Sequence, residues 1–191
     1  MNQKNLLEVD WSKIPAPTDD GAAAHLVGMT IPEVRLVATD DSTVTLSALP
    51  GRTVVFAYPR TGEPGKISLV DDWDMIPGAR GCTPQTCSFR DLFAELKAAG
   101  AKHVFGLSTQ SNAYQTEMAS RLHLPFPVLS DEKLQLTRAL NLPVMEVAGL
   151  TLIKRLALVI DDGRIMHVFY PVFPPDRNAG DVLMWLKDSP V

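Results

Sequence analysis

Two cysteines five residues apart, Cys82 and Cys87, are the side chains of this 191-residue sequence best suited to covalent chemistry. A thiolate is a strong nucleophile, and a second thiol nearby can close a disulfide once the first has been oxidised. The chain has no other cysteine. In a reducing compartment such a close pair is more often catalytic, redox-active or metal-binding than a structural crosslink.

The residues that follow the first cysteine predict the start of a helix. Thr83 is a good N-cap, Pro84 suits the first helical position, and Gly100 provides a C-terminal stop. Cys82 would then stand just before a helix N-terminus, where free backbone N–H groups and the positive end of the helix dipole favour a thiolate. Apolar residues follow at helical spacing, namely Phe89, Leu92, Phe93 and Leu96.

The spacing of the two cysteines predicts a conformational change if they bond. Five residues of regular helix rise about 7.5 Å and place the two Cα atoms roughly 8–9 Å apart. A disulfide needs a Cα separation below about 7 Å. The first helical turn must therefore unwind, and oxidation should expose the amides of residues 83–88 to hydrogen exchange.

Other interpretations of the pair stay open at this point. Two buried structural cysteines are one alternative, because free cysteine is common in protein cores and Cys87 fits a core-facing helix position. A closed zinc site needs four ligands, and the histidines show no ligand spacing. We therefore expect no metal, and without a glycine-rich phosphate loop we expect no haem, flavin or nicotinamide cofactor. The histidines are His25, His103, His123 and His167.

Length and composition indicate one ordinary globular domain. The chain is 46% hydrophobic and 21% charged, with a net charge of −4 and no basic stretch to follow a phosphate backbone. We therefore expect no nucleic-acid partner. No segment approaches the roughly 20 apolar residues of a membrane span, and the N-terminus lacks the apolar run of a signal peptide. A cytoplasmic protein without a membrane partner is the expectation.

The order of predicted elements indicates an α/β protein. A β-α-β unit is followed by β-β-α, with the first cysteine between a buried strand and its helix, which describes a thioredoxin-like fold with an N-terminal β-hairpin extension. Residues 1–29 are read as a lead-in, and residues 30–191 as a single domain. The predicted elements are a hairpin over 33–49, a buried strand over 53–59, a long loop over 60–81, the cysteine helix, a strand over 103–108, a helix over 112–122, a strand over 126–130, a helix over 131–140, strands over 152–160 and 164–170 joined by a turn at 161–163, and a helix over 178–187.

The cysteine segment and its flanks resemble the peroxiredoxins, specifically the bacterioferritin-comigratory or Q-type class. The resemblance spans about residues 30 to 187 and is carried by a strand that ends in Tyr-Pro, by the cysteine motif, and by an arginine that opens a strand ending in Ile-Asp. The matching segments are VVFAYPR, GCTPQTCSFRD, FGLST, FPVLSD and RLALVID.

The resemblance implies an antioxidant thiol peroxidase that reduces hydrogen peroxide or small organic hydroperoxides. Cys82 would be the peroxidatic cysteine and become a sulfenic acid, and Cys87 would resolve it as an intramolecular disulfide. Arg155 would hold the thiolate and orient the peroxide, with Gln85 and Pro59 in supporting positions. A thioredoxin- or glutaredoxin-like dithiol would recycle the enzyme, which would be a monomer or a homodimer.

One departure from the family pattern concerns the substrate pocket. Family members carry a threonine three residues before the first cysteine, where this chain has Ala79. The loop over 60–81 is also longer than the family's usual one. We expect this insertion to rebuild the pocket by folding Thr61 into the missing role or by using Pro77 as a shield; otherwise peroxidase activity is weak. Trp73 makes the loop either a packed surface insertion or a lid over the cysteine.

Two further functions remain as alternatives. A thioredoxin-like disulfide exchanger usually carries C-x-x-C at the helix start, and the C-x-x-x-x-C of this chain does not match it. A redox sensor or chaperone without efficient peroxidase activity would instead signal through the unwinding of the helix.

Overall fold

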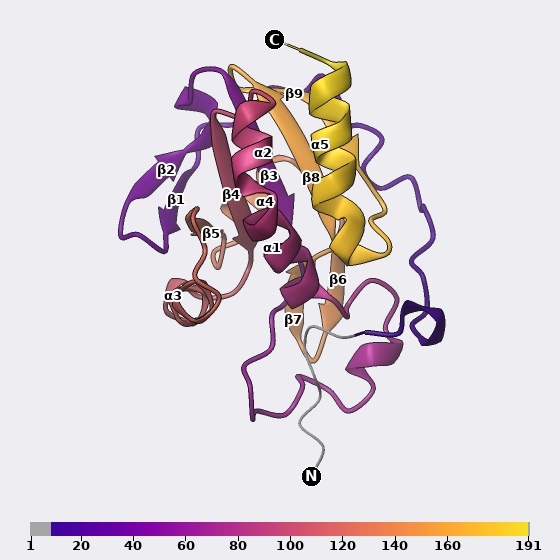
Figure 1. Ribbon diagram of the computed structural model, residues 1–191. Coiled ribbons are helices and arrows are strands. Elements are labelled where there is room, and N and C mark those ends of the chain that lie inside the picture. The colour runs from indigo at the N-terminus through magenta and orange to yellow at the C-terminus, as the bar shows by residue number, and fades with distance from the viewer. Residues whose placement is uncertain (1–8, 191) are drawn as a thin grey trace.

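The computed structural model describes residues 9–190, which form a seven-stranded mixed sheet covered by helices, with a small two-stranded sheet at one end (Figure 1). Helices α1, α2 and α5 lie along one face of the large sheet. The strands are β1 (Arg35–Ala38), β2 (Thr43–Thr45), β3 (Arg52–Ala57), β4 (His103–Ser108), β5 (Val128–Ser130), β6 (Val144–Val147), β7 (Leu150–Ile153), β8 (Leu156–Asp161) and β9 (Arg164–Phe169). The helices are α1 (Cys82–Asp91), α2 (Phe93–Ala98), α3 (Asn112–Arg121), α4 (Gln135–Ala139) and α5 (Asn178–Asp188), with short 3₁₀ turns η1 (Trp11–Lys13), η2 (Leu46–Ala48), η3 (Trp73–Met75) and η4 (Pro175–Arg177).

Strand β3 lies inside the large sheet, between β4 and β8, and the strand order of the sheet is β2-β1-β5-β4-β3-β8-β9. It pairs in parallel with β4 and antiparallel with β8, and each of its residues is buried. Because side chains alternate across a strand, Val54 and Phe56 enter the core under α1, α2 and α5, whereas Val55 and Ala57 enter the core on the other face. This explains why the run reads as continuously apolar.

Most of the predicted elements are confirmed. The hairpin expected over 33–49 is the β1–β2 pair, and the turn at Asp162–Gly163 joins β8 to β9 with positive φ angles of 46° and 78°. Strand β4 has the predicted bounds, and α5 starts at the predicted residue. The stripe expected on α5, Val182, Leu183 and Leu186, is buried.

The start of the cysteine helix was predicted two residues too late. Thr83 is not the N-cap, because α1 begins at Cys82 and Gly81 takes the cap position with φ 105°. Only a glycine adopts that conformation without strain. The backbone N–H of Gln85 donates to the Gly81 carbonyl at 3.0 Å. Pro84 therefore lies in the first turn, where its missing N–H costs no helical bond. The predicted single helix is also divided at Leu92, whose φ of −100° and ψ of 13° separate α1 from α2.

The strand predicted over 152–160 is divided as well. Strand β7 ends at Ile153 and β8 begins at Leu156, so Lys154 and Arg155 form a corner between the small sheet and the large one. The β6–β7 hairpin was not predicted at all. Its turn places Ala148 at φ 50° and Gly149 at φ 76°, and an Ala-Gly pair is a weaker turn signal than Asn-Gly.

The described part of the N-terminal lead-in packs on the domain. Leu26 is fully buried with the core beneath β1 and β3, and Asp20 forms an ion pair with Lys154 at 2.6 Å. Residues 1–8 of the predicted lead-in lie outside the described residues. In residues 9–190, none of the helices has the length and apolar character needed to cross a membrane.

Candidate active site

Cys82 is the first residue of α1 and is only 3% exposed. It follows the end of the 60–81 loop, so β3, this loop and α1 together fix its position. Cys82 therefore lies at the N-terminus of α1, where the backbone N–H groups of the first turn have no intrahelical partner and the helix dipole is positive. The Thr86 hydroxyl donates to the Cys82 carbonyl at 2.9 Å and ties the turn together.

Arg155 lies directly against Cys82. Its Nη2 donates to the Cys82 Sγ at 3.3 Å, and the side chain is 2% exposed. A guanidinium is always charged, so this contact stabilises a thiolate. The same nitrogen faces three backbone carbonyls at the end of the insertion, those of Gly78, Ala79 and Arg80, at 3.1, 3.3 and 3.0 Å.

Gln85 joins this group from the same turn of α1. Its Oε1 accepts a hydrogen bond from Arg155 Nη1, and its Nε2 donates to the Asn178 Oδ1 at 2.9 Å. Gln85 is fully buried. The structure thus brings together three predicted site residues, Cys82, Gln85 and Arg155. Asn178 was missed, because an asparagine at a helix start is an ordinary sequence feature.

Thr61, the residue expected to replace the missing threonine, makes no described hydrogen bond to Cys82 or Arg155. Its backbone N–H and hydroxyl both donate to Gln110 Oε1, at 2.9 and 3.1 Å, and its carbonyl accepts from the Tyr114 hydroxyl at 3.1 Å. Pro59, between Thr61 and the end of β3, is buried. Thr61 therefore belongs to a polar cluster with Gln110 and the Tyr114 side chain of α3.

The backbone of the insertion contacts both Cys82 and Arg155 at Ala79. The Ala79 carbonyl lies 3.5 Å from the Cys82 Sγ and also accepts from Arg155. Ala79 is fully buried with Trp73, Val147 and Leu152, so the insertion is anchored on the β6–β7 hairpin. A packed insertion was one of the two predictions for Trp73, and the packing holds the carbonyls of residues 78–80 against the guanidinium.

Cys87 has a different environment one turn further along α1. It is 6% exposed and packs in the apolar core with Phe56 and Phe89. Burial raises the pKa of the Cys87 thiol, and the nearby charge of Arg90 only partly opposes this effect. Both cysteines are free thiols in the structure.

Comparison with known proteins assigns the family. The Redoxin family model matches residues 26–183, most of the chain. A protein named Peroxiredoxin Q, chloroplastic, from Triticum aestivum is 31% identical over 182 residues, which cover 91% of this chain and 75% of that protein. The chain belongs to the Redoxin family, as a peroxiredoxin. Peroxiredoxin Bcp of Escherichia coli is 32% identical over 84% of this chain and 95% of its own length.

Solved structures agree with this assignment. The Mycobacterium tuberculosis protein described as Peroxidoxin BcpB has a TM-score of 0.68 and 26% identity, and the match covers 86% of this chain and 98% of that one. Xylella fastidiosa PrxQ, at 22% identity and a TM-score of 0.67, shows the same fold. The predicted thioredoxin-like architecture is confirmed. Membership of the peroxiredoxins supports a thiol-dependent peroxidase over the disulfide exchanger and the sensor.

Proposed function

We propose that this peroxiredoxin reduces hydroperoxides with Cys82 as the peroxidatic and Cys87 as the resolving cysteine. The observation that carries the proposal is the contact of 3.3 Å between Arg155 Nη2 and the Cys82 Sγ at the first residue of α1. A fixed positive charge and the first helical N–H groups favour the thiolate there. Cys87 has no such charged contact at its sulfur among the described hydrogen bonds, and burial favours its neutral form.

The reaction proceeds in three balanced steps. The Cys82 thiolate attacks one oxygen of the hydroperoxide, an S–O bond forms as the O–O bond breaks, and the departing alkoxide or hydroxide takes a proton. The sulfur is oxidised by two electrons to a sulfenic acid. The Cys87 thiol then displaces water from that sulfur and forms the disulfide. A dithiol protein of the thioredoxin or glutaredoxin type finally reduces the disulfide by exchange. A cytoplasmic location, which suits such recycling, is part of the proposal.

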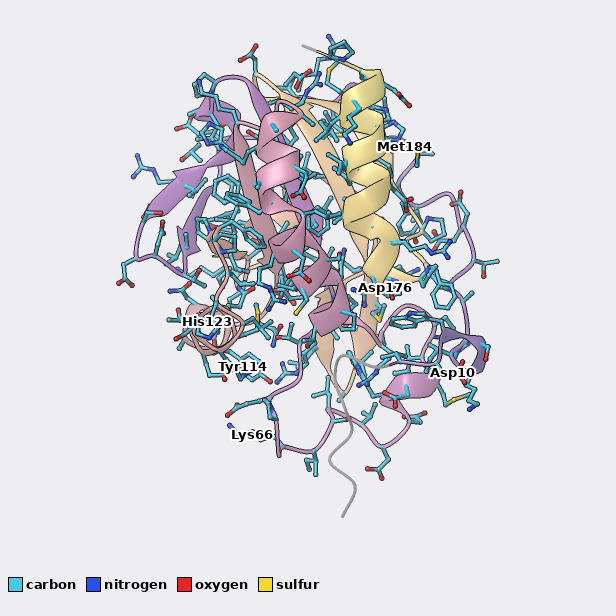
Figure 2. All side chains as sticks on the ribbon, viewed as in Figure 1. Asp10, Lys66, Tyr114, His123, Asp176 and Met184 are labelled. Atoms are coloured by element: carbon cyan, nitrogen blue, oxygen red, sulfur yellow. The ribbon has the colours of Figure 1, made fainter. Side chains whose placement is uncertain are left out.

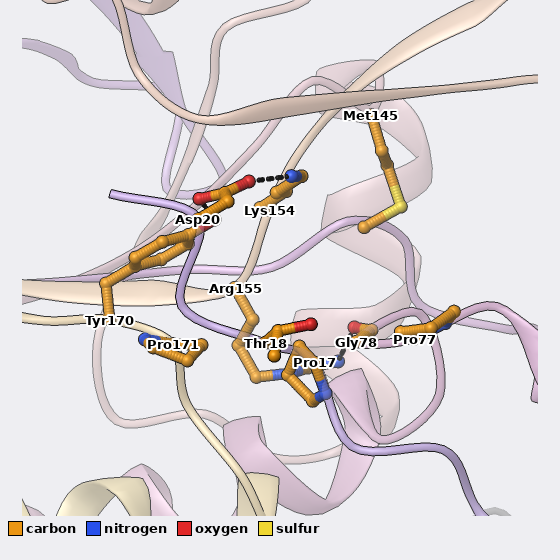
Figure 3. Close-up of a pocket in the computed structure, with 10 residues that line it drawn as sticks. All are labelled: Pro17, Thr18, Asp20, Pro77, Gly78, Met145, Lys154, Arg155, Tyr170 and Pro171. Carbon is orange, nitrogen blue, oxygen red and sulfur yellow. Dashed lines mark hydrogen bonds and ion pairs between the residues drawn. The ribbon is translucent and has the colours of Figure 1, made fainter. Parts of the chain in front are cut away.

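Arg155 keeps a donor for the peroxide at its Nε. Its Nη1 and Nη2 are engaged, whereas its buried Nε has no hydrogen-bond partner among the described residues. Arg155 also borders a cavity of about 160 Å³ between the lead-in, the insertion and the corner after β7 (Figure 3). An unmet buried donor beside a cavity favours an oxygen ligand there. Cys82 itself does not line this cavity, so we infer that Nε orients a hydroperoxide that reaches the Cys82 sulfur past Arg155. The cavity is lined by Pro17, Thr18, Asp20, Pro77, Gly78, Met145, Lys154, Arg155, Tyr170 and Pro171.

Disulfide closure in this mechanism needs a change in α1. Both cysteines lie within one continuous α-helix, Cys82–Asp91. Residues five apart in a regular helix are roughly 8–9 Å apart at Cα, beyond the reach of a disulfide. We propose that the first turn unwinds after oxidation and delivers the Cys82 sulfenic acid to Cys87.

A single-turnover experiment tests the order of the cysteines. In Cys87→Ser, one equivalent of hydrogen peroxide should add one oxygen atom to Cys82, detected by intact mass after trapping with dimedone, and turnover with a dithiol should stall. In Cys82→Ser both steps should be lost. Stopped-flow loss of thiolate should be far faster than for free cysteine. A rate equal to that of free cysteine, or equal effects of the two substitutions, would overturn the proposal.

A further inference from the structure

Asn178 reaches the catalytic group from a part of the chain remote in sequence. It is the first residue of α5 and is 1% exposed. Its Oδ1 accepts from Gln85 Nε2 at 2.9 Å, and Gln85 Oε1 accepts from Arg155 Nη1. Arg155 in turn contacts the Cys82 sulfur. A chain of hydrogen bonds therefore runs from α5 through α1 to the peroxidatic thiol.

The direction of these hydrogen bonds is fixed by chemistry. A guanidinium has donors and no acceptor, so Gln85 must turn its oxygen toward Arg155. The amide nitrogen of Gln85 then faces Asn178, which must present an oxygen in return. Only a side chain with an acceptor in this place satisfies Gln85.

The amide nitrogen of Asn178 does not hold the side chain in place. Its Nδ2 is buried and has no hydrogen-bond partner among the described residues. Leaving a buried donor unpaired costs roughly 1–3 kcal/mol. The hydrogen bond that remains for the Asn178 side chain is the one that its oxygen accepts from Gln85. The need of Gln85 for an acceptor therefore explains an asparagine at this position better than the stability of α5 does.

The neighbouring segments keep Asn178 and α1 together. Both η4 and α5 pack against α1, and Asp176 of η4 lies at the end of α5 nearest the start of α1 (Figure 2). Trp11 Nε1 donates to Asp176 Oδ2 at 3.0 Å, which joins the lead-in to the same corner. A hypothetical Cβ on Gly81 would lie 2.6 Å from Pro175, so the contact between η4 and the residue before Cys82 is close.

We propose that Asn178 is a positioning residue, which holds Gln85 and, through it, the guanidinium of Arg155 in place against Cys82. The proposal rests on the proposed function, because the peroxide reaction of Cys82 is the step that Arg155 serves. Asn178 itself contacts neither the sulfur nor the peroxide. Its effect is to limit the orientations open to Gln85 and Arg155.

Two substitutions at Asn178 distinguish the role of its acceptor oxygen from the role of its side-chain volume. Asn178→Leu removes the acceptor at similar volume, whereas Asn178→Asp keeps an acceptor oxygen, and the helix N-terminus favours the added negative charge. One neutral hydrogen bond changes a rate by roughly fivefold to tenfold. We expect Asn178→Leu to lower the second-order rate constant with hydrogen peroxide by about that factor and Asn178→Asp to retain at least about a third of it. Equal losses in the two variants would overturn the proposal.

A matched variant controls for the stability of α5. Leu186 is buried two turns further along the same helix, so Leu186→Ala destabilises α5 without touching the hydrogen-bond chain. It should leave the peroxide rate constant within about twofold of the starting protein. A loss in Leu186→Ala equal to that in Asn178→Leu would show that only helix stability matters and would refute the positioning role.

Two further measurements test whether Asn178 acts through Gln85. In a double-mutant cycle, Asn178→Leu added to Gln85→Leu should cause no further loss, and additive losses would contradict the proposal. The side-chain amide resonance of Gln85 should move in Asn178→Leu and stay in place in Leu186→Ala, as seen by NMR. This resonance reports the contact even if the chain fails as a peroxidase. A resonance that does not move would overturn the inference alone, whereas a slow unmodified protein would overturn the proposed function.

Discussion

Cys82 and Cys87 lie on one ten-residue helix and are almost equally buried, at 3% and 6% exposure, yet their surroundings differ in kind. The sulfur of Cys82 contacts the guanidinium of Arg155 and a backbone carbonyl. Cys87 packs among aromatic and aliphatic side chains, and burial raises the pKa of its thiol. Burial alone therefore does not decide what a cysteine does.

The contacts of Cys82 must serve two successive steps of the reaction. The first turn must hold Cys82 in a fixed geometry while the peroxide reacts, so several polar contacts converge on it. The same turn must afterwards release, because Cys87 can bond to Cys82 only when the helix is locally open. A charged and hydrogen-bonded shell suits this compromise, since it can be exchanged for water more readily than a packed apolar core.

The largest expected effect is the difference in peroxide rate constant between substitutions of Arg155, near Cys82, and Arg90, near Cys87. Arg155→Met removes the charge that faces Cys82, and we expect the rate constant for its oxidation by peroxide to fall about a thousandfold, near the upper end of losses seen when one donor at a reacting oxygen is removed. Arg90 acts on Cys87 through its charge and has no described hydrogen bond to Cys82, so Arg90→Met should change that rate constant by less than about threefold. Stopped-flow tryptophan fluorescence measures both. Similar losses in the two variants would show that Arg155 has no special role at Cys82.

The next effect concerns the glycine that precedes Cys82. Gly81 has φ 105°, and an added Cβ would lie 2.6 Å from Pro175 and 2.7 Å from Trp11. Gly65 in the insertion also has a positive φ, of 79°, but has open space around it. We expect Gly81→Ala to cost about 2–4 kcal/mol of unfolding free energy and Gly65→Ala about 1–2 kcal/mol, from backbone strain alone.

Urea unfolding of the reduced proteins measures both glycine variants. Gly81→Ala should also slow peroxide reduction, because the backbone must move to relieve the clash of the added Cβ and Cys82 moves with it. Gly65→Ala should react at the normal rate. If both alanines cost the same free energy, the close packing of η4 and the lead-in on the site is not important for the fold.

The scaffold around the pair could be predicted from the sequence because its signals are local. The run that forms β3 is apolar at each position of a strand buried on both faces, and the Asp-Asp-Gly turn fixes the β8–β9 hairpin. The helical spacing of Phe89, Leu92, Phe93 and Leu96 predicted the cysteine helix, although its start was placed after Cys82. Cys82, Gln85 and Arg155 came from the motif and its resemblance, and the structure places them in contact.

The remaining parts of the site depend on tertiary contacts that no local pattern encodes. Asn178 lies 93 residues from Gln85, and an asparagine at a helix start has many ordinary explanations. Thr61 was expected to replace the missing threonine, whereas its hydroxyl donates to Gln110, and what lies beside Arg155 at position 79 is a backbone carbonyl. Backbone carbonyls are present at each residue, so sequence does not mark the ones that point inward.

A smaller effect tests the release of the first turn. In the reduced protein the backbone N–H of Gln85 donates to the Gly81 carbonyl, whereas the N–H of Thr83 lies in the first turn without an intrahelical partner and Pro84 has no N–H. Protection of backbone amides from hydrogen exchange should therefore be confined to residues 85–88. We expect oxidation to reduce that protection by at least about tenfold, while α3 stays unchanged. Hydrogen exchange with mass spectrometry compares the two redox states, and Cys87→Ser treated with peroxide is the control without a disulfide. Equal protection in both states would mean that the disulfide forms without unwinding.

The smallest effect comes from the buried thiol of Cys87. Burial raises its pKa above the ordinary value of 9.0, so the unfolded chain loses this proton at lower pH than the folded protein. The stabilisation is complete below about pH 9 and is lost as pH rises from there through the folded pKa, at a slope no steeper than about 1.4 kcal/mol per pH unit. The unfolding free energy of the parent minus that of Cys87→Ala should therefore fall as the pH rises above about 9 under reducing conditions. Tyr58, whose pKa burial also raises, is present in both proteins and cancels. A difference that stays constant or grows over this range would show that Cys87 is not held as a neutral thiol, and the contrast with Cys82 would lose its electrostatic basis.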